Sequence, residues 1–311
     1  MKIVVTGSAG RLGSGVARAL LAAGHEVVAT DVRLPTEPTP EVRVVDLCHI
    51  DAVRELMQGA EAVCHLGNLP GFGGAPGATP IGRSKGFINN TATNYNVFLA
   101  ATEAGVRRIV YASSIQAYGC CGYTSTNGPG IFSRPQYLPL DEDHPLNPVD
   151  AYPLSKAVGE SIAASFCQAL PDLTAWSMRF SGIAMPRPPR PPEARPPQPA
   201  PPQGAAPPGG APRKYVPGAG PTLGSLCTWV HMEDAVRATV LACGLDRPGH
   251  TPLNILAQTS RPAWSPEALT AIFGAVPPFR RTMVPEEPLI SPERAERLLG
   301  FRAEHRQAEQ R

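Results

Sequence analysis

The sequence has no long apolar run, no excess of charge of either sign and only 6% aromatic residues. A membrane-spanning helix needs about 20 consecutive apolar residues, and no stretch of the chain approaches that length. The first residues, Met1-Lys2 followed by Ile3–Val5, are too short for the apolar core of a signal peptide and instead predict a strand. The net charge of +2 gives no indication of a nucleic-acid or membrane-surface partner. We therefore expect a soluble protein with neither kind of partner.

Paired cysteines are also lacking. The seven cysteines are an odd number, scattered along the chain without a Cys-x-x-Cys pair, and the adjacent Cys120 and Cys121 cannot easily bridge to each other. This usage is typical of reduced thiols in a cytoplasmic protein rather than of a disulfide framework or a zinc site. His65, inside a predicted strand, has no carboxylate or second histidine at ligand spacing, which favours a packed histidine over a metal ligand. We expect no bound metal.

Proline, in contrast, is abundant. Many of the 37 prolines lie between Pro186 and Pro221, mixed with alanine, glycine and arginine. Such a segment forms neither helix nor central strand, which predicts a disordered insertion at 186–221. It could serve as a docking strip for a proline-recognising partner. An insertion in a surface loop without such a role is the reading that composition favours.

The first half of the chain alternates apolar runs with helical patterns, which predicts βαβ units and a parallel sheet. The predicted strands are Lys2–Thr6, Glu26–Thr30, Val42–Val45, Ala62–Leu66, Arg108–Ala112 and Thr174–Phe180. The predicted helices are Leu12–Ala23, residues 50–58, Ile88–Glu103 and Tyr152–Leu170. Right-handed crossovers assemble these elements into an α/β fold with a doubly wound parallel Rossmann sheet.

The pattern changes after residue 180. The later segments predict a strand at Cys227–Val230, a helix over about 233–242, a strand at Leu253–Leu256 and short helices at Pro266–Phe273 and Pro292–Leu299. We expect residues 1–180 to form the sheet domain and residues 181–311 a small substrate-binding cap. This second region would contain the proline-rich insertion and return in part to the sheet.

A glycine-rich motif stands where the first strand becomes a helix. In Thr6–Gly13, Gly7 permits a tight turn, Gly10 lets the backbone approach a pyrophosphate and Gly13 lets the helix pack on the strand. Arg11 and Leu12 open that helix beside the phosphates. Asp31 ends the second strand about 20 residues on, where a carboxylate accepts hydrogen bonds from ribose hydroxyls and repels a 2′-phosphate. The motif therefore predicts NAD rather than NADP, although Arg33 could soften that preference and Asp31 could be a simple strand-end residue.

Tyr152 and Lys156 lie four residues apart near the start of a predicted helix and so project from one face. A phenol has a pKa near 10, and a neighbouring ammonium favours its ionised form, which can take the proton of a substrate hydroxyl. Ser114 follows the fifth strand, where such sheets bind ligands, and its hydroxyl can orient the substrate oxygen. Ser113 takes this place if the register slips by one. The alternative is that Tyr152 is only an aromatic residue at the start of the helix and Lys156 only a solvated charge.

This order of motifs resembles the extended short-chain dehydrogenase/reductases, in particular the NAD-dependent epimerase/dehydratase family. The resemblance implies that Asp46 and Leu47 contact the adenine, that Leu66 and Gly67 line the cofactor, and that Asn90 steadies the active-site helix. It also implies a catalytic set and a substrate-binding set: Ser114, Tyr152 and Lys156 for the first, and Asn68, Ser114, Gln116 and Ser181 for the second. His231 and Asp234, in Trp229–Asp234, are expected to be structural, with hydrogen bonding and helix capping.

Two departures from the family bear on the reaction. The family's 4,6-dehydratases carry an Asp-Glu pair after the active-site serine, whereas this chain has Ile115-Gln116, which cannot move those protons. Its nucleotide-sugar epimerases carry an asparagine where this chain has Gly182. Three segments are instead similar to uronate dehydrogenases, which oxidise free sugar acids: His65–Gly67, Met178–Ser181 and Leu226–Val230.

The leading hypothesis is an NAD-dependent oxidoreductase that transfers a hydride at a secondary alcohol or carbonyl of a sugar or sugar-acid-like substrate. A second is an NAD-dependent epimerase of sugars or nucleotide sugars that retains its cofactor. A third is a non-catalytic NAD-binding scaffold. Members of the family commonly self-associate through two long helices. The resemblance therefore implies a homodimer formed through Ile88–Glu103 and Tyr152–Leu170.

Overall fold

The computed structural model describes residues 1–34, 41–69, 80–121, 133–184, 226–260 and 263–305. The predicted proline-rich insertion at 186–221 lies outside these described residues. Within them, no helix is both long enough and apolar enough to cross a membrane.

Seven parallel strands form the central sheet in the order β3-β2-β1-β4-β5-β6-β9. Their bounds are β1 Lys2–Thr6, β2 Glu26–Asp31, β3 Val42–Val44, β4 Ala62–His65, β5 Arg108–Ser114, β6 Thr174–Phe180 and β9 Gly249–Ile255. The strand order reverses between β1 and β4, and such a switch point opens a crevice at the carboxyl ends of the strands. The predicted doubly wound Rossmann sheet is confirmed.

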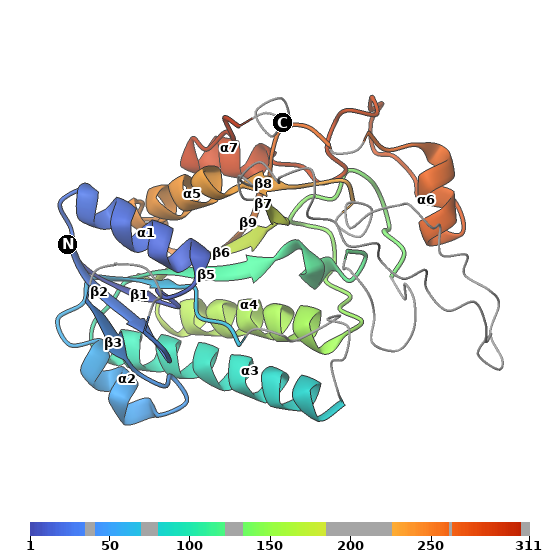
Figure 1. Cartoon of the computed structure of the whole chain (residues 1–311). Helices are drawn as coiled ribbons and strands as arrows, with labels where there is room; N and C mark the ends of the chain where they lie inside the picture. Colours follow the sequence, from blue (N-terminus) through green and yellow to red (C-terminus); the bar gives the residue numbers. More distant parts are fainter. Residues whose placement is uncertain (35–40, 70–79, 122–132, 185–225, 261–262, 306–311) are drawn as a thin grey trace, which may run out of the picture.

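Helices cover both faces of this sheet (Figure 1). One face carries α1 (Arg11–Ala22), α5 (Met232–Gly244) and α7 (Glu293–Leu299), and the other carries α2 (Ile50–Leu56), α3 (Pro80–Glu103) and α4 (Ala151–Ala169). The strands are buried from both sides, which explains why they read as continuous apolar runs such as Ile3–Val5. One apolar core lies on each face and fixes the strand ends that carry the polar residues.

A third apolar cluster lies beyond the carboxyl ends of the strands. It joins the one-turn helix η1 (Ile115–Tyr118) to segments around residues 138–140 and 289–290 and to α6 (Pro266–Phe273). A two-stranded parallel pair, β7 (Ile183–Ala184) with β8 (Val230–His231), connects this region to the end of β6. Strand β9 returns from this half of the chain to pair with β6.

Three predicted boundaries are wrong. Helix α3 begins at Pro80 rather than Ile88, because proline suits the first turn of a helix, where its missing N–H is not needed. The strand expected at Cys227–Val230 begins only at Val230, since Leu226 and Cys227 adopt left-handed φ angles of 51° and 58°, which a strand cannot contain. β9 starts at Gly249, four residues before the predicted Leu253.

Candidate active site

The turn between β1 and α1 is built so that only glycine fits. Gly7 has φ of +69°, and a Cβ there would lie 2.8 Å from the Gly67 backbone. A Cβ on Gly13 would overlap the Gly7 carbonyl oxygen, so the glycine allows the helix to start against the strand. Gly10 caps α1 without a side-chain hydrogen bond, and the first turn holds no acidic residue. The N–H groups of the first turn of α1 and the buried Ser8 Oγ, which has no hydrogen-bond partner among the described residues, therefore suit an anionic group.

Asp31 closes this turn from the end of β2. Its Oδ2 accepts a hydrogen bond from the Ala9 N–H at 3.0 Å, which places the carboxylate beside the glycine turn. The position is compatible with the ribose-binding role that the sequence predicts, and that role stays a prediction.

Thr6 ties β1 to the end of β4 and fixes the state of His65. The Thr6 Oγ1 accepts the N–H groups of Leu66 and Gly67, at 3.1 and 3.0 Å, so its own proton goes to His65 Nδ1 at 2.8 Å. His65 Nε2–H then donates to Asn94 Oδ1 at 2.9 Å. Burial lowers the pKa of His65 to about 4, so it is neutral and hydrogen-bonded at both nitrogens, as expected of a packed histidine.

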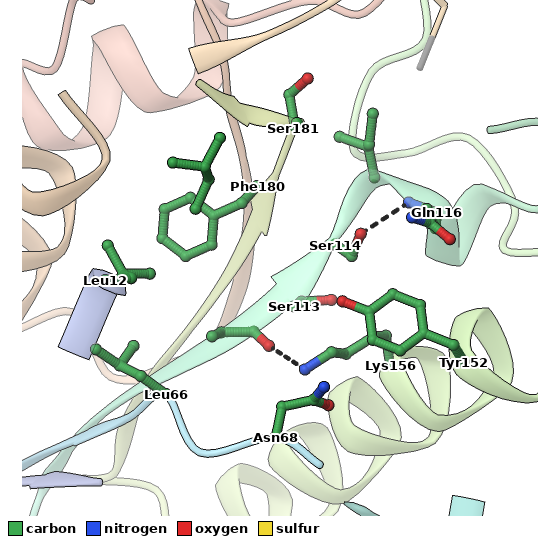
Figure 2. A pocket seen from close by; sticks show the side chains of 14 residues that line it. Leu12, Leu66, Asn68, Ser113, Ser114, Gln116, Tyr152, Lys156, Phe180 and Ser181 are labelled. Carbon is green, nitrogen blue, oxygen red and sulfur yellow. Dashed lines mark hydrogen bonds between the residues drawn. The ribbon is translucent and has the colours of Figure 1, made fainter. Parts of the chain in front are cut away.

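A cavity of about 260 Å³ opens at the carboxyl ends of β1, β4, β5 and β6. Figure 2 shows Tyr152 and Lys156 reaching from α4 toward the end of β5, where Ser114 lies. Eight of the residues predicted from the sequence line it together: Leu12, Leu66, Asn68, Ser114, Gln116, Tyr152, Lys156 and Ser181. The three predicted catalytic side chains thus face one space, although they come from segments some 40 residues apart.

Lys156 is fully enclosed beneath Tyr152. Its Nζ donates to the Ala112 carbonyl oxygen at 2.7 Å and lies 5.6 Å from the centre of the Tyr152 ring. Burial lowers the pKa of Lys156 to about 7, and the negative charge of Glu160 opposes that shift. The amine is therefore close to its titration point at neutral pH, where small changes in its surroundings change its charge.

The two adjacent serines have different partners. Ser113 donates to Glu160 Oε1 at 2.6 Å, which uses its proton inside the protein. Ser114 caps η1 by accepting the Gln116 N–H at 3.2 Å, so its own proton can be donated to a ligand. The geometry favours Ser114 over Ser113 as the group that orients a substrate oxygen.

A buried ion pair that the sequence did not reveal lies behind the site. Arg179 on β6 binds Glu160 on α4 through two hydrogen bonds of 2.9 and 2.7 Å, and both side chains are at most 5% exposed. Arg179 Nη1 also donates to the Tyr118 hydroxyl at 2.8 Å, and that hydroxyl donates to Asn254 Oδ1 at 2.9 Å. The pair joins α4, β5, β6 and β9 directly beneath Lys156.

Other predicted residues lie outside the cavity lining. Asp46 Oδ1 accepts the Cys48 N–H and Leu47 is buried against Gly67, both near the end of β3. Asn90 on α3 accepts the Leu69 N–H at 2.9 Å, while its Nδ2 is buried and has no partner within the described part of the chain. Their cofactor roles stay predictions. Sequence reasoning missed Phe180 and Ile183, which also line the cavity, although their place close to Ser181 at the end of β6 was a usable signal.

A family model describes residues 3–255, which is most of the chain, as the NAD dependent epimerase/dehydratase family. The chain belongs to this family. The resemblance noted from the motifs is thereby confirmed, and it extends through β9, the last strand of the sheet.

Among curated relatives of this NAD dependent epimerase/dehydratase family member, GDP-mannose 3,5-epimerase 1 of Oryza sativa subsp. japonica is 30% identical over 171 residues, covering 53% of this chain and 42% of that protein. Uronate dehydrogenase of Pseudomonas syringae pv. tomato is 29% identical over 171 residues, covering 53% and 54%. The match thus spans about half the length of each relative.

Solved structures share the fold. A short-chain dehydrogenase/reductase superfamily protein from Agrobacterium tumefaciens with bound NAD has a TM-score of 0.68 at 23% identity, over 100% of this chain and 94% of that one. MoeE5 in complex with UDP-glucose and NAD has a TM-score of 0.65 at 21% identity, over 100% and 96%. At these sequence identities the similarity shows a shared fold and nothing beyond it.

The buried Lys156 makes stability depend on pH. Its pKa is about 7 in the folded protein against the ordinary 10.5, so between pH 7 and about 10 the unfolded chain binds the additional proton. The free energy of unfolding therefore rises with pH in that window, by at most about 1.4 kcal/mol per pH unit from this group. We expect Lys156→Met to remove this rise in urea titrations, and Lys85→Met, on the exposed side of α3, to keep it. An equal rise in Lys156→Met would contradict the assignment.

Proposed function

We propose that the protein is an NAD-dependent oxidoreductase that acts at a secondary alcohol or carbonyl of a sugar or sugar-acid-like substrate. One observation carries the proposal: Ser114, Tyr152 and Lys156 line a single cavity at the carboxyl ends of the strands. Residues 1–180 would form the cofactor-binding domain and 181–311 the substrate-binding region.

The residues around the β1–α1 turn fit NAD. The turn of Gly7, Gly10 and Gly13, with Arg11 and Leu12 at the start of α1, would hold the pyrophosphate, and Asp31 would accept the adenosine ribose hydroxyls. Asp46 and Leu47 would contact the adenine. Leu66, Gly67 and Asn90 would contact the remaining parts of the cofactor. When bound, NAD supplies the acceptor or donor of the hydride.

The proton chemistry falls to the chain's own side chains. Ser114 donates its hydroxyl proton to the substrate oxygen and so orients it. Tyr152 takes the proton from that oxygen when an alcohol is oxidised and returns it in the reverse direction. Lys156, in its charged form beneath the ring, favours the phenolate. Because the amine also contacts Ala112, it holds a fixed place from which it can bind the nicotinamide ribose.

A sugar-like substrate suits the rest of the cavity. Asn68, Gln116 and Ser181 offer polar groups beside Ser114, as hydroxyl-rich ligands require, while Leu12, Phe180 and Ile183 supply an apolar wall. Ile115-Gln116 provides no acid–base pair, which argues against elimination of water. The relative that oxidises uronates supports a sugar acid as the first substrate to test.

The test is the absorbance of reduced nicotinamide when purified protein and NAD receive free uronic acids, aldoses or nucleotide sugars in turn. Reduced cofactor that accumulates with one class establishes a dehydrogenase and its substrate. Absence of reduced cofactor and of any altered sugar across the panel would overturn the proposal and favour the non-catalytic NAD-binding scaffold.

Epimerisation is the second candidate, and the similarity to GDP-mannose 3,5-epimerase 1 favours it. An epimerase returns the hydride to the same substrate, so it would show no net change in absorbance. It would retain NAD through gel filtration, and chromatography would reveal an isomerised sugar.

Asp31 should determine the choice of cofactor. We expect Asp31→Ser to lower kcat/KM for NAD about 10- to 100-fold, because it removes a charged hydrogen-bond acceptor, and to raise kcat/KM for NADP, because it removes the repulsion of the 2′-phosphate. Steady-state kinetics with both cofactors measure the ratio. The matched control is Asp51→Ser, since that aspartate is exposed on α2. An unchanged ratio in Asp31→Ser would show that the carboxylate does not meet the ribose.

We also propose a homodimer through α3 and α4. These two helices lie side by side on one face of the sheet (Figure 1). They expose three large apolar side chains, Ile88, Tyr95 and Leu154, at 62%, 50% and 41%. Burying such groups in a shared interface would be favourable. Light scattering of the purified protein measures the assembly.

A further inference from the structure

Where the chain's last described segment crosses the start of α5, two histidines and a glutamate meet. One ligand atom each from His231, Glu233 and His305 lies within 4.8 Å of the other two. The histidines are 74 positions apart in sequence, which is why the motif around His231 did not reveal its proximity to His305. Across the described ranges this is the group of three or more His, Cys, Asp or Glu side chains that could hold a metal ion.

The surroundings of His305 are those of a metal ligand with a supporting carboxylate. Its Nδ1 lies 3.0 Å from Asp234 Oδ2, and its Nε2 lies 3.0 Å from Glu233 Oε2. A carboxylate on one imidazole nitrogen orients the ring so that the other nitrogen can bind a metal. Zinc bonds of about 2.0–2.1 Å in tetrahedral geometry place neighbouring ligand atoms roughly 3.3 Å apart, close to the separation of His305 Nε2 and Glu233 Oε2.

His231 brings the second nitrogen ligand. Its ring stacks on that of His305 with centres 3.9 Å apart and planes inclined by 20°. Because both rings must direct a lone pair at one ion, a metal would require them to splay apart by side-chain rotation. The mostly exposed Glu233 side chain can follow that movement.

The local charge favours a divalent cation. Among the residues that the structure describes, the carboxylates of Asp234 and Glu304 pair with one arginine, Arg237, at 3.0 and 3.4 Å, and Glu233 lies beside His305. With both imidazoles neutral, an excess of negative charge remains at this point. A divalent ion neutralises it, whereas a protonated His305 would do so in part.

We propose that His231, Glu233 and His305 bind a divalent transition metal such as Zn²⁺, with Asp234 orienting His305. The ion joins the segment around residue 305 to α5. It also holds β8 in place, because His231 pairs with Ala184 of β7, next to Ile183 in the wall of the cavity. The site is structural and independent of the proposed hydride transfer.

Zn²⁺ titration of chelator-treated full-length protein by calorimetry tests this, together with the visible spectrum after Co²⁺ is added. We expect one equivalent to bind, a tetrahedral Co²⁺ spectrum without thiolate charge-transfer bands, and a higher Tm with Zn²⁺. His305→Gln and Glu233→Gln should each weaken binding by at least about tenfold. The control His49→Gln changes an exposed histidine beside Asp46 and should bind as the wild type does.

The other outcomes overturn the proposal. Folded protein that binds no Zn²⁺ would make the cluster an ordinary imidazolium–carboxylate contact. Binding that survives both His305→Gln and Glu233→Gln, or a spectrum with thiolate bands, would place the ion on other residues. Circular dichroism of each variant shows whether the fold is retained. Because the Glu233 side chain is mostly exposed, Glu233→Gln is not expected to disturb folding, so a loss of binding in that variant reports on the site itself.

Discussion

Tyr152→Phe lowers turnover by about 10²- to 10⁴-fold while NAD binding stays nearly unchanged. The substitution removes only the hydroxyl, and general acid–base groups contribute rate factors of this size. The ring keeps its place above Lys156, and the glycine turn that would hold the pyrophosphate is untouched. Turnover is measured with the substrate found in the panel, and NAD binding by fluorescence or calorimetry.

The matched control is Tyr95→Phe, which removes the same group from a half-exposed tyrosine on α3. It should turn over like the wild type. Full activity in Tyr152→Phe would show that another group moves the proton. Loss of NAD binding along with turnover would instead indicate that the hydroxyl holds the cofactor site together.

Arg179→Met lowers the free energy of unfolding by about 3–5 kcal/mol, because it leaves the Glu160 carboxylate buried without its charged partner. The Tyr118 hydroxyl also loses a donor. Replacing both partners, in Glu160→Leu/Arg179→Met, should recover much of the loss, since an apolar pair of similar volume carries no desolvated charge. Urea unfolding of the three proteins measures the differences.

The exposed pair of Arg54 with Glu103 is the control, because a solvated ion pair contributes little. Arg54→Met should unfold like the wild type. If Arg179→Met is equally mild, water reaches the Glu160 site and the buried pair does not anchor α4 to the sheet. A double variant no more stable than Arg179→Met would show that packing, and not charge, dominates.

Much of this fold could be predicted from local sequence patterns. The apolar runs placed β1 and β6 at their observed bounds, because strands covered on both faces are largely apolar. The turn between β1 and α1 could be predicted because a side chain at each of its glycines would lie too close to the backbone. The sequence placed Ser114 ahead of Ser113, but the hydrogen bond from Ser113 to Glu160, which distinguishes the two serines, could not be predicted.

Features that join distant segments could not be read in this way. Glu160 and Arg179 are each unremarkable in sequence, and only the packing of α4 on β6 makes them a pair. The same holds for His231 and His305. The start of α3 at Pro80 was missed because Gly82 and Gly86 weaken the helical pattern there. The predicted insertion at 186–221 lies outside the described residues.

The proposed function requires that a hydride moves between the substrate carbon and NAD in the cavity of Ser114, Tyr152 and Lys156. The most direct measurement uses a sugar acid deuterated at the carbon to be oxidised, with mass spectrometry of the nicotinamide after a single turnover. We expect deuterium in the reduced nicotinamide of the wild type and almost none in Tyr152→Phe. Product formed by the wild type without deuterium in the cofactor would contradict it.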